Sequence, residues 1–369
     1  MLEYFFIAFI AIVCIQFVYY VIIFGSFSFS KKKPSQNNFN LPVSVIICAK
    51  NEAKNLTNNL PLFLKQNYEN FELVLINDRS QDRTLKVMEL FKKESSVPIK
   101  IVDVAVNEQF WGSKKYALTL GIKAASYEHL LFTDADCGPV SESWISEMAG
   151  NFNAKHQIVL GYGAYQKIKK SWLNKLIRFE SLFTAIQYFS YAKIGIPYMG
   201  VGRNLAYTKS TFFKVNGFIN HMKIKSGDDD LFINEVATNE NTAISCSQNS
   251  FTESIPKTNF KDWIHQKRRH ISTASFYKPL HKFLLGLFFV SQFLFWILAA
   301  LLLGFMYQWE IIAGLIFARL LFQYLVIGFS AKKLNEGDLI PLIPFFEIFL
   351  ILMQMFIFIK NIRSKPTHW

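Results

Sequence analysis

The sequence predicts an α/β domain with a mostly parallel sheet, flanked by hydrophobic helices that can cross a membrane. Between about residues 42 and 278, short apolar runs alternate with helix-like stretches, which is typical of a parallel sheet. Long uncharged runs stand on both sides of this block. Hydrophobic residues make up 51% of the 369-residue chain and charged residues only 18%, a balance that favours a membrane-integrated protein over a soluble one.

The first hydrophobic run, residues 4–24, has no charge and is long enough to span a bilayer. It is too long for the core of a signal peptide, so we expect residues 1–30 to form a transmembrane helix. Residues 31–41 are polar and read as a linker. Three lysines open this linker, and the positive-inside rule therefore puts the following block in the cytoplasm.

The α/β domain is expected over residues 42–278. Apolar runs predict four buried strands, at residues 43–48, 71–76, 99–104 and 129–133. Helix-like stretches separate them, at residues 52–66, 82–93 and 113–125. Parallel strands end at one edge of the sheet, and open α/β sheets bind their ligands at that edge.

The C-terminal membrane region is expected over residues 279–369. Residues 283–305 and 311–330 read as two further spans, and residues 341–359 could form a fourth. Four complete crossings would leave the basic C-terminal tail outside, against the charge rule. Either the last segment re-enters or lies in the interface, or the short tail violates the rule. Arg319 lies within the third span, where it could meet a lipid phosphate or pair with Glu347.

The net charge of +13 does not predict a nucleic-acid partner. Basic residues crowd near the ends of the hydrophobic segments, a pattern expected from attraction to anionic lipid head groups. No nucleic-acid recognition motif accompanies them. The four cysteines are scattered without a paired spacing, so neither a disulfide framework nor a zinc site is predicted.

Acidic residues mark the predicted ligand edge. Asp78 follows the second strand, and Asp134 and Asp136 follow the fourth. Alternate positions of an extended segment face the same side, so these last two carboxylates can address one site. Hard oxygen ligands with open positions for phosphate suit Mg²⁺ or Mn²⁺.

A third acidic run, Asp228, Asp229 and Asp230, opens a helical stretch. Part of this run is expected to cap the helix, because carboxylates favour helix N-termini. Three in a row exceed what a cap needs. Crowding of like charges is expected to raise the pKa of at least one of them, which suits a general base.

Other candidate residues lie in turns and at helix starts. The turn with Ala49, Asn51 and Glu52 can hydrogen-bond a nucleobase or ribose, and Lys114 can reach a phosphate. Helix capping and an ordinary surface lysine are the alternatives; Asp82 in particular looks like a cap. Residues 200–204 lack the spacing of a dinucleotide fingerprint, and tight turns near an acceptor site explain their glycines as well.

An amphipathic helix is expected just before the second span. Aromatic and basic residues interleave there as in a membrane-surface helix, which explains Trp263, Lys267 and Arg268 without chemistry. Gln266 and Arg269 are three residues apart and hence share a face.

Taken together and in order, these segments resemble a membrane-integrated family 2 glycosyltransferase with a GT-A type domain, related to polysaccharide synthase-like enzymes. Six motifs over residues 42–275 carry the resemblance. They are the opening strand and turn VSVIICAKNE, the run NDRSQDRT at residues 77–84, SKKYALT at residues 113–119, the Asp-x-Asp at Asp134 and Asp136, Gly227-Asp228-Asp229, and QKRRH at residues 266–270.

The resemblance implies a role for each motif. Ala49, Asn51, Glu52 and Asp78 would bind the nucleotide of a sugar donor, with Lys114 nearby. The Asp-x-Asp pair would hold the donor diphosphate through Mg²⁺ or Mn²⁺.

Asp229 would deprotonate the acceptor hydroxyl in an inverting single displacement, with Asp228 as the competing assignment. Gln266, Arg269 and His270 would contact the acceptor or the diphosphate. UDP-linked donors are the common case among relatives.

One departure bears on the product. His270 stands where the polymer-making members have a tryptophan that helps to hold the acceptor. Single transfer to a lipid-linked or saccharide acceptor is therefore slightly favoured over processive polysaccharide synthesis. A catalytically silent membrane scaffold is the alternative from another class, although the intact acidic motifs argue against it. We expect a multi-pass protein of the cell (inner) membrane with a cytoplasmic catalytic domain.

Overall fold

The computed structural model describes residues 1–31, 41–105, 114–224 and 226–363. It divides into an α/β unit, drawn from residues 32–174 and 195–258, and a helical unit, drawn from residues 1–31, 175–194 and 259–368. Most of the predicted linker lies outside the described residues. The two units are considered in turn.

The α/β unit contains a seven-stranded sheet in the order β3-β2-β1-β4-β8-β6-β9. Its strands are β1 (Val43–Ala49), β2 (Phe71–Asn77), β3 (Ile99–Asp103), β4 (His129–Asp134), β6 (Ile158–Leu160), β8 (Leu205–Thr208) and β9 (Thr242–Ile244). The first four pair in parallel, as the sequence predicted, and only β8 runs against its neighbours β4 and β6. The mostly parallel α/β fold is thereby confirmed.

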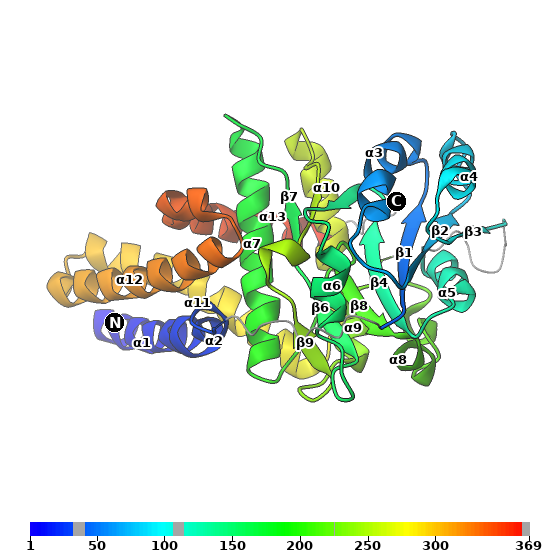
Figure 1. The fold of residues 1–369 in the computed structure, drawn as a ribbon. Coiled ribbons are helices and arrows are strands. Elements are labelled where there is room, and N and C mark those ends of the chain that lie inside the picture. Colours follow the sequence, from blue (N-terminus) through cyan, green and yellow to red (C-terminus); the bar gives the residue numbers. More distant parts are fainter. Residues whose placement is uncertain (32–40, 106–113, 225, 364–369) are drawn as a thin grey trace. The chain divides into compact units, whose positions relative to one another are not determined.

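Helices and a small second sheet complete this unit (Figure 1). The helices are α3 (Ala53–Leu64), α4 (Thr84–Glu94), α5 (Lys114–Ala124), α6 (Trp144–Ala149), α8 (Lys209–Lys214) and α9 (Asp230–Val236), with short 3₁₀ turns η3 (Ile219–His221) and η4 (Gln248–Ser250). The small sheet joins β5 (Cys137–Pro139), β10 (Thr252–Ser254) and β7 (Gly163–Tyr165).

Helix α5 approaches the sheet closely because of one glycine. A Cβ added at Gly121 would lie 2.2 Å from Ile76 Cδ1, so only glycine lets α5 rest against β2 at this point. The start of α5 carries Lys114 and Lys115, and the close approach therefore fixes where these two lysines lie.

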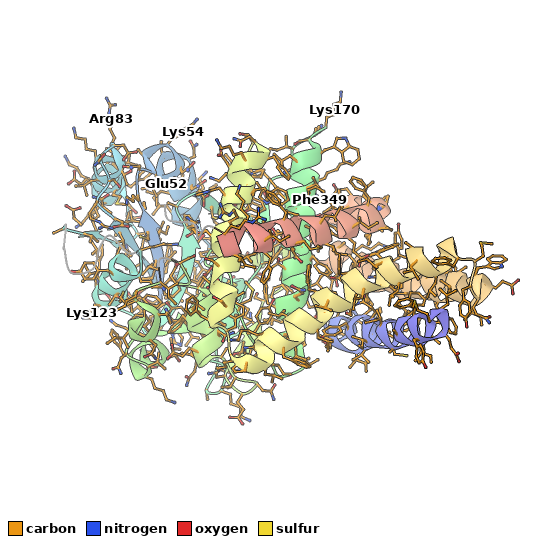
Figure 2. All side chains as sticks on the ribbon, turned by 180° about the vertical axis from the view of Figure 1, so that it is seen from behind. Glu52, Lys54, Arg83, Lys123, Lys170 and Phe349 are labelled. Carbon is orange, nitrogen blue, oxygen red and sulfur yellow. The ribbon has the colours of Figure 1, made fainter. Side chains whose placement is uncertain are left out.

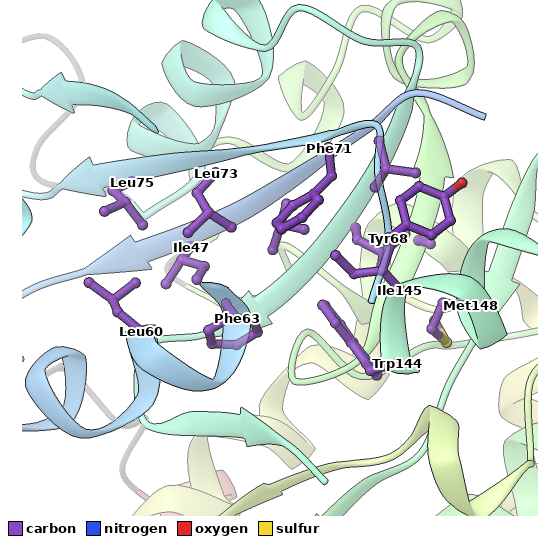
Figure 3. Close-up of a cluster of buried hydrophobic side chains, with 14 of the residues drawn as sticks. Ile47, Leu60, Phe63, Tyr68, Phe71, Leu73, Leu75, Trp144, Ile145 and Met148 are labelled. Carbon is purple, nitrogen blue, oxygen red and sulfur yellow. The ribbon is translucent and has the colours of Figure 1, made fainter. Parts of the chain in front are cut away.

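The main core of the unit lies between the strands and the helices α3 and α6 (Figure 3). Phe63 of α3 meets Trp144 of α6 edge to face, with 5.6 Å between the ring centroids. The indole N–H of Trp144 donates to Asn204 Oδ1 at 3.1 Å, so the buried ring leaves no polar atom unsatisfied. Large apolar side chains on alternate strand positions supply the rest, each contributing about 1.5–3 kcal/mol on burial.

The register of the central strands assembles the ligand edge. Ala49 pairs with Asn77, and Cys48 pairs with Asp134, so strands β1, β2 and β4 end together. Because β8 is antiparallel to β4, with Leu205 opposite Phe132, it begins where β4 ends. Residues 200–204 are therefore delivered to the same edge.

The helical unit contains ten helical segments among the described residues. They are α1 (Leu2–Phe17), the π-helical η1 (Val18–Phe24), α2 (Gly25–Ser28), α7 (Trp172–Lys193, whose first turn belongs to the α/β unit), α10 (Phe260–Thr273), α11 (Pro279–Gly304), α12 (Trp309–Lys333), η6 (Gly337–Leu342) and α13 (Ile343–Arg363), with a short 3₁₀ turn η5 (Ala274–Phe276) after α10. Figure 1 shows α1, α11 and α12 side by side.

Four stretches of this unit are long and apolar enough to cross a membrane: Leu2–Ser28, Pro279–Gly304, Trp309–Lys333 and Gly337–Arg363. They correspond to the four hydrophobic runs that the sequence indicated. The last run forms one continuous helical stretch of 27 residues, which is a spanning length.

One side of α10 packs against other helices of the helical unit, while Phe260, Lys261 and His265 are exposed. Trp263 is fully buried and stacks on Phe349 of α13, labelled in Figure 2, with 6.3 Å between the ring centroids. Lys267 pairs with Glu180 of α7, and Arg268 Nε donates to Asn361 Oδ1 at 2.9 Å. These three α10 residues thus have partners on α7 and α13, and the position of α10 at a membrane surface stays a prediction.

Arg319 meets the second of its two predicted partners. Its guanidinium forms a buried ion pair with Glu347, with Nη1 2.8 Å from Oε2. The plainer of the two alternatives that the sequence left open, pairing inside the helical unit, is the one that the structure adopts.

Candidate active site

Three segments bring charged side chains together at the ligand edge of the sheet. Lys114, at the start of α5, donates to Asp134 Oδ1 at 2.8 Å and lies 3.1 Å from Asp228 Oδ2. A small cavity of about 20 Å³ lies among them, enough for one water molecule. Its polar wall is formed by Lys114, Thr133, Asp134, Gly202, Asp228 and Asp229, and its floor by Ile46, Cys48, Leu118, Phe132, Leu205 and Tyr207.

Asp134 and Asp136 converge as predicted, although by a different route. One ligand atom from each, together with the Cys137 sulfur, lies within 4.8 Å of the others. The strand ends at Asp134, and residues 135 and 136 form a turn. The turn, and not the alternation of an extended strand, therefore turns the two carboxylates to one side.

The donor atoms in this cluster favour a hard cation. Burial and then the charge of Asp136 hold the pKa of the Cys137 thiol well above its usual range, so this sulfur stays protonated. Desolvation and the charge of Asp134 likewise raise the pKa of Asp136. Two carboxylates that repel each other across an open position fit Mg²⁺ or Mn²⁺, which would relieve that repulsion.

Asp229 is held by two backbone N–H groups. Gly202 N donates to its Oδ2 at 2.7 Å and Asp230 N to its Oδ1 at 2.8 Å, so it caps α9 as the sequence suggested. Burial, followed by the charges of Asp228 and Asp230, raises the pKa of Asp229 to about 7. Each oxygen keeps a lone pair beyond its one hydrogen bond, so a carboxylate in this position can accept a proton near neutral pH.

Asp228 is neutralised by Lys114. Burial lowers the pKa of this lysine, but the charges of Asp134 and Asp228 outweigh burial and hold it well above its usual range. The ammonium therefore keeps its charge. It links the carboxylate pair of Asp134 and Asp136 to the acidic run of residues 228–230 before α9. This bridge separates the environments of Asp228, paired with a cation, and Asp229, held by neutral N–H groups.

Hydrogen bonds connect the turn after β1 to the turn after β2. Asn51, in the left-handed region with φ 59°, accepts from Gln81 N at 2.8 Å and donates its own N–H to Ser80 Oγ at 3.0 Å. Asp82 accepts from Ala53 N at 3.2 Å and from Thr84 N at 2.9 Å. Asp82 thus accepts from the first backbone N–H groups of α3 and α4, although the N-cap position of α4 is Arg83 and not Asp82 as the sequence favoured. The Asn51 side chain also serves the fold.

Asp78 lies at the end of β2 and is buried beside Arg79. Its backbone N–H donates to the Ala49 carbonyl at 2.8 Å, and Arg79 Nε donates to its Oδ1 at 2.8 Å.

Burial raises the pKa of Glu52, and the charges of Asp136 and Asp134 raise it further. The carboxylate of Glu52, labelled in Figure 2, is therefore close enough to Asp134 and Asp136 to feel their negative charges.

Two residues of the 200–204 turn, which the sequence analysis placed near an acceptor site without a role, also lie at this edge. Gly202 supplies an N–H to Asp229, and a Cβ on it would meet Asp229 Oδ2 at 3.3 Å. Arg203 stacks on the Tyr165 ring at 4.1 Å and donates to the Ala164 carbonyl at 3.0 Å. The reversed direction of β8 brings both here, and a four-residue strand carries no sequence signal for its direction.

Gln266, Arg269 and His270 lie on α10 in the helical unit. The helix is continuous from residue 260 to 273, so Gln266 and Arg269 share a face, and His270 is exposed. Their contact with acceptor or diphosphate stays a prediction.

Gly227 shapes the approach to the acidic run, and its replacement should be costly. Its φ is +90°, and a Cβ would lie 2.5 Å from Leu231 Cδ1. We expect Gly227→Ala to lower the free energy of unfolding by about 1–3 kcal/mol, measured by thermal unfolding in detergent. Gly337→Ala is the control, because a Cβ there meets nothing within 4 Å. Equal melting of both variants would contradict the strained turn.

Comparison with known proteins finds similarity to one family over part of the chain. Residues 44–217 match the model of glycosyl transferase family 2. The poly-beta-1,6-N-acetyl-D-glucosamine synthase of Staphylococcus epidermidis is 36% identical over 94 residues, which are 26% of this chain and 21% of that one. An uncharacterized glycosyltransferase of Haemophilus influenzae is 32% identical over 126 residues, 34% of this chain and 37% of that one. The matched segments thus span about a fifth and about a third of these relatives.

A solved structure shares the fold. The mannosyltransferase PcManGT from Pyrobaculum calidifontis, in complex with GDP-Man and Mn²⁺, superimposes with a TM-score of 0.61 at 16% identity. The match covers 91% of this chain and 99% of that one. The α/β unit therefore has the GT-A fold that the sequence predicted.

Proposed function

Because this chain carries a family 2 glycosyltransferase domain, we propose that it transfers a sugar from a nucleotide-sugar donor to a lipid-linked or saccharide acceptor. The observation that carries the proposal is the convergence of Asp134, Asp136, Asp228 and Asp229 around Lys114. Asp134 and Asp136 suit a divalent cation, and Asp229 suits a general base. Lys114 connects the two groups of carboxylates, since it contacts both Asp134 and Asp228. They lie at the edge where open α/β sheets bind ligands.

Asp134 and Asp136 would hold Mg²⁺ or Mn²⁺, and that ion would stabilise the negative charge of the departing nucleoside diphosphate. Lys114 could also stabilise that negative charge, because its ammonium donates to Asp134 and keeps its positive charge. The loops after β1 and β2, with Ala49, Asn51, Glu52 and Asp78, would bind the nucleotide. The mannosyltransferase of the same fold was crystallised with GDP-Man and Mn²⁺, which supports a nucleotide sugar and a divalent cation as ligands.

We assign the general base to Asp229. A base is most effective when its pKa lies near the working pH, and burial with two neighbouring carboxylates brings the pKa of Asp229 to about 7. Asp228 is less suited, because Lys114 pairs with it. Removal of a proton from the acceptor hydroxyl by Asp229 would allow attack on the donor sugar in a single, inverting displacement.

The pH dependence of the reaction follows from this assignment. Asp229 works only when deprotonated, so kcat/KM is expected to fall as the pH drops through about 7. Asp230→Asn removes one of the charges that raise this pKa, and it should move the acid limb to lower pH. A pH profile of donor turnover measures both, and an acid limb that Asp230→Asn leaves in place would contradict the assignment.

The charge distribution supports a cytoplasmic catalytic domain in the cell membrane. Lys31 follows the first span, and Lys332 and Lys333 end the third. The short connection between the second and third spans, residues 305–308, has no basic residue. An orientation with these lysine-rich ends and the α/β domain inside obeys the positive-inside rule for the first three spans, whereas a complete fourth crossing would leave Lys360 and Arg363 outside. Anionic lipids would then contact these basic ends.

Product formation by the purified protein tests the proposal. The full chain in detergent would be given Mn²⁺ or Mg²⁺, native lipid extract and a panel of nucleotide sugars. UDP-GlcNAc comes first because of the Staphylococcus relative and GDP-mannose second because of the PcManGT structure. We expect metal-dependent release of nucleoside diphosphate together with a glycosylated product. Binding of no nucleotide sugar in the presence of metal would sink the proposal and favour a silent scaffold.

The size of the product separates the two modes of synthesis. His270 in place of a tryptophan favours a single addition to the acceptor, whereas similarity to a polysaccharide synthase over 94 residues favours a polymer. Mass spectrometry of the extracted lipid product distinguishes one added sugar from a ladder of sizes.

A further inference from the structure

A second lysine on α5 holds the backbone that leads to the acidic run. Lys115 follows Lys114 directly, and its side chain is buried, with 1% exposed. Its Nζ donates to the carbonyl oxygens of His221 at 2.7 Å, Ile224 at 3.0 Å and Ser226 at 2.8 Å. An ammonium has three N–H donors, and three carbonyls from a stretch of six residues accept them.

The described backbone of this stretch, residues 221–224 and 226, also makes local hydrogen bonds. The N–H groups of His221 and Ile224 donate to the carbonyls of Phe218 and His221. Such bonds shape the stretch without joining it to α5. Hydrogen bonds from a charged donor are stronger than those between neutral groups, so Lys115 is a strong link between this stretch and the helix.

The anchored stretch ends immediately before the candidate base. The Ser226 carbonyl belongs to the peptide that precedes Gly227, whose positive φ turns the chain into Asp228 and Asp229. A shift of this peptide would carry both carboxylates with it. Lys114 meanwhile holds the Asp228 side chain, so two adjacent lysines fix the acidic run from its backbone and from its side chain.

We propose that Lys115 is a positioning residue of the transfer reaction, which holds the backbone at His221, Ile224 and Ser226 and thereby sets Asp228 and Asp229 opposite Lys114 and Asp134. The inference rests on the proposed function for its catalytic consequence. It acts through the backbone and touches neither donor nor acceptor. A general base must lie within hydrogen-bond reach of the proton that it removes, so a displacement of about 1 Å can lower the rate about 100-fold.

The test uses Lys115→Met, which keeps most of the side-chain length and removes all three donors. The matched control is Lys123→Met on the same helix, where the lysine is exposed (Figure 2). Two measurements are made on the full chain in detergent. The first is amide hydrogen exchange without any nucleotide, and the second is turnover of the donor identified above.

We expect exchange over residues 221–230 to be faster in Lys115→Met and unchanged in Lys123→Met. We also expect kcat to fall about 10- to 100-fold with the donor KM within about twofold of wild type, and the acid limb of the pH profile to move. A general loss of stability would raise exchange across the whole α/β unit instead and would not separate kcat from KM.

The outcomes are distinct. Wild-type exchange and wild-type kcat in Lys115→Met would overturn the inference. If Lys115→Met does not fold, Lys115→Gln, which keeps two N–H donors, is measured in its place and must show intermediate losses; wild-type behaviour in that variant overturns the inference as well. Absence of turnover in the wild-type protein would count against the proposed function, while the exchange result would still decide whether Lys115 anchors the stretch.

Discussion

Asp229→Asn is expected to lower kcat of sugar transfer by about 10³-fold while leaving donor affinity within a few-fold of wild type. General bases typically contribute about 10²–10⁴ in rate, and asparagine keeps the shape of the side chain but cannot take up the proton. Asparagine also keeps one oxygen that can accept from the N–H of Asp230 or Gly202, so the cap of α9 is only partly lost. Steady-state kinetics with direct measurement of donor binding separates the two effects.

Asp228→Asn is the matched control for this prediction. It removes the partner of Lys114 and is expected to change donor affinity as well as rate, because the lysine also lies on Asp134. A loss of kcat larger in Asp228→Asn than in Asp229→Asn, at unchanged donor affinity, would contradict the assignment and transfer the role of base to Asp228.

The second large effect is a loss of stability, expected when the buried ion pair between the four span-length helices is broken. Glu347 is buried and accepts from Arg319, and also from Gln292 Nε2 at 2.8 Å. Arg319 further donates to Gln323 at 2.7 Å and to Gln16 at 3.0 Å, so the cluster draws a polar side chain from each of the four span-length stretches. Loss of Glu347 would leave the guanidinium buried without a counter-charge.

We expect Glu347→Ala to destabilise the protein by about 3–5 kcal/mol, seen as a large drop in the thermal unfolding temperature in detergent. The double variant Arg319→Leu with Glu347→Leu should recover most of that loss, because an apolar pair of similar volume needs no counter-charge. Glu310→Ala, at an exposed position in the first turn of α12, is the control. Wild-type melting of Glu347→Ala would show that the ion pair does not hold these helices.

The strands that the sequence predicted well are those with long apolar runs. β1 was expected at residues 43–48 and lies at Val43–Ala49, and β4 extends the expected 129–133 by one residue because Asp134 pairs with Cys48. Both faces of each strand are buried, so an unbroken apolar run, residues 45–49 in β1 and 130–132 in β4, marks the strand. The four apolar helices were found for the same reason.

The parts that escaped prediction depend on contacts distant in sequence. β6 and β7 have three residues each, too few to show a period. The direction of β8 decides that Gly202 reaches Asp229, and pairing direction is a property of the folded sheet and not of a four-residue run. The sequence analysis did not single out Lys115, because its three acceptors are backbone carbonyls about a hundred residues away, which leave no mark in side-chain patterns.

Metal-dependent donor binding tests the central claim most directly, because it needs neither acceptor nor turnover. Titration calorimetry of the full chain with the preferred nucleotide sugar, in Mn²⁺ and then in excess chelator, would be compared for wild type, Asp136→Ala and the exposed-residue control Glu89→Ala. We predict binding that requires Mn²⁺, is lost in Asp136→Ala and persists in Glu89→Ala. Equal affinity of wild type and Asp136→Ala for the donor in Mn²⁺ would contradict the assignment of Asp134 and Asp136 as the site that holds the donor diphosphate through a cation.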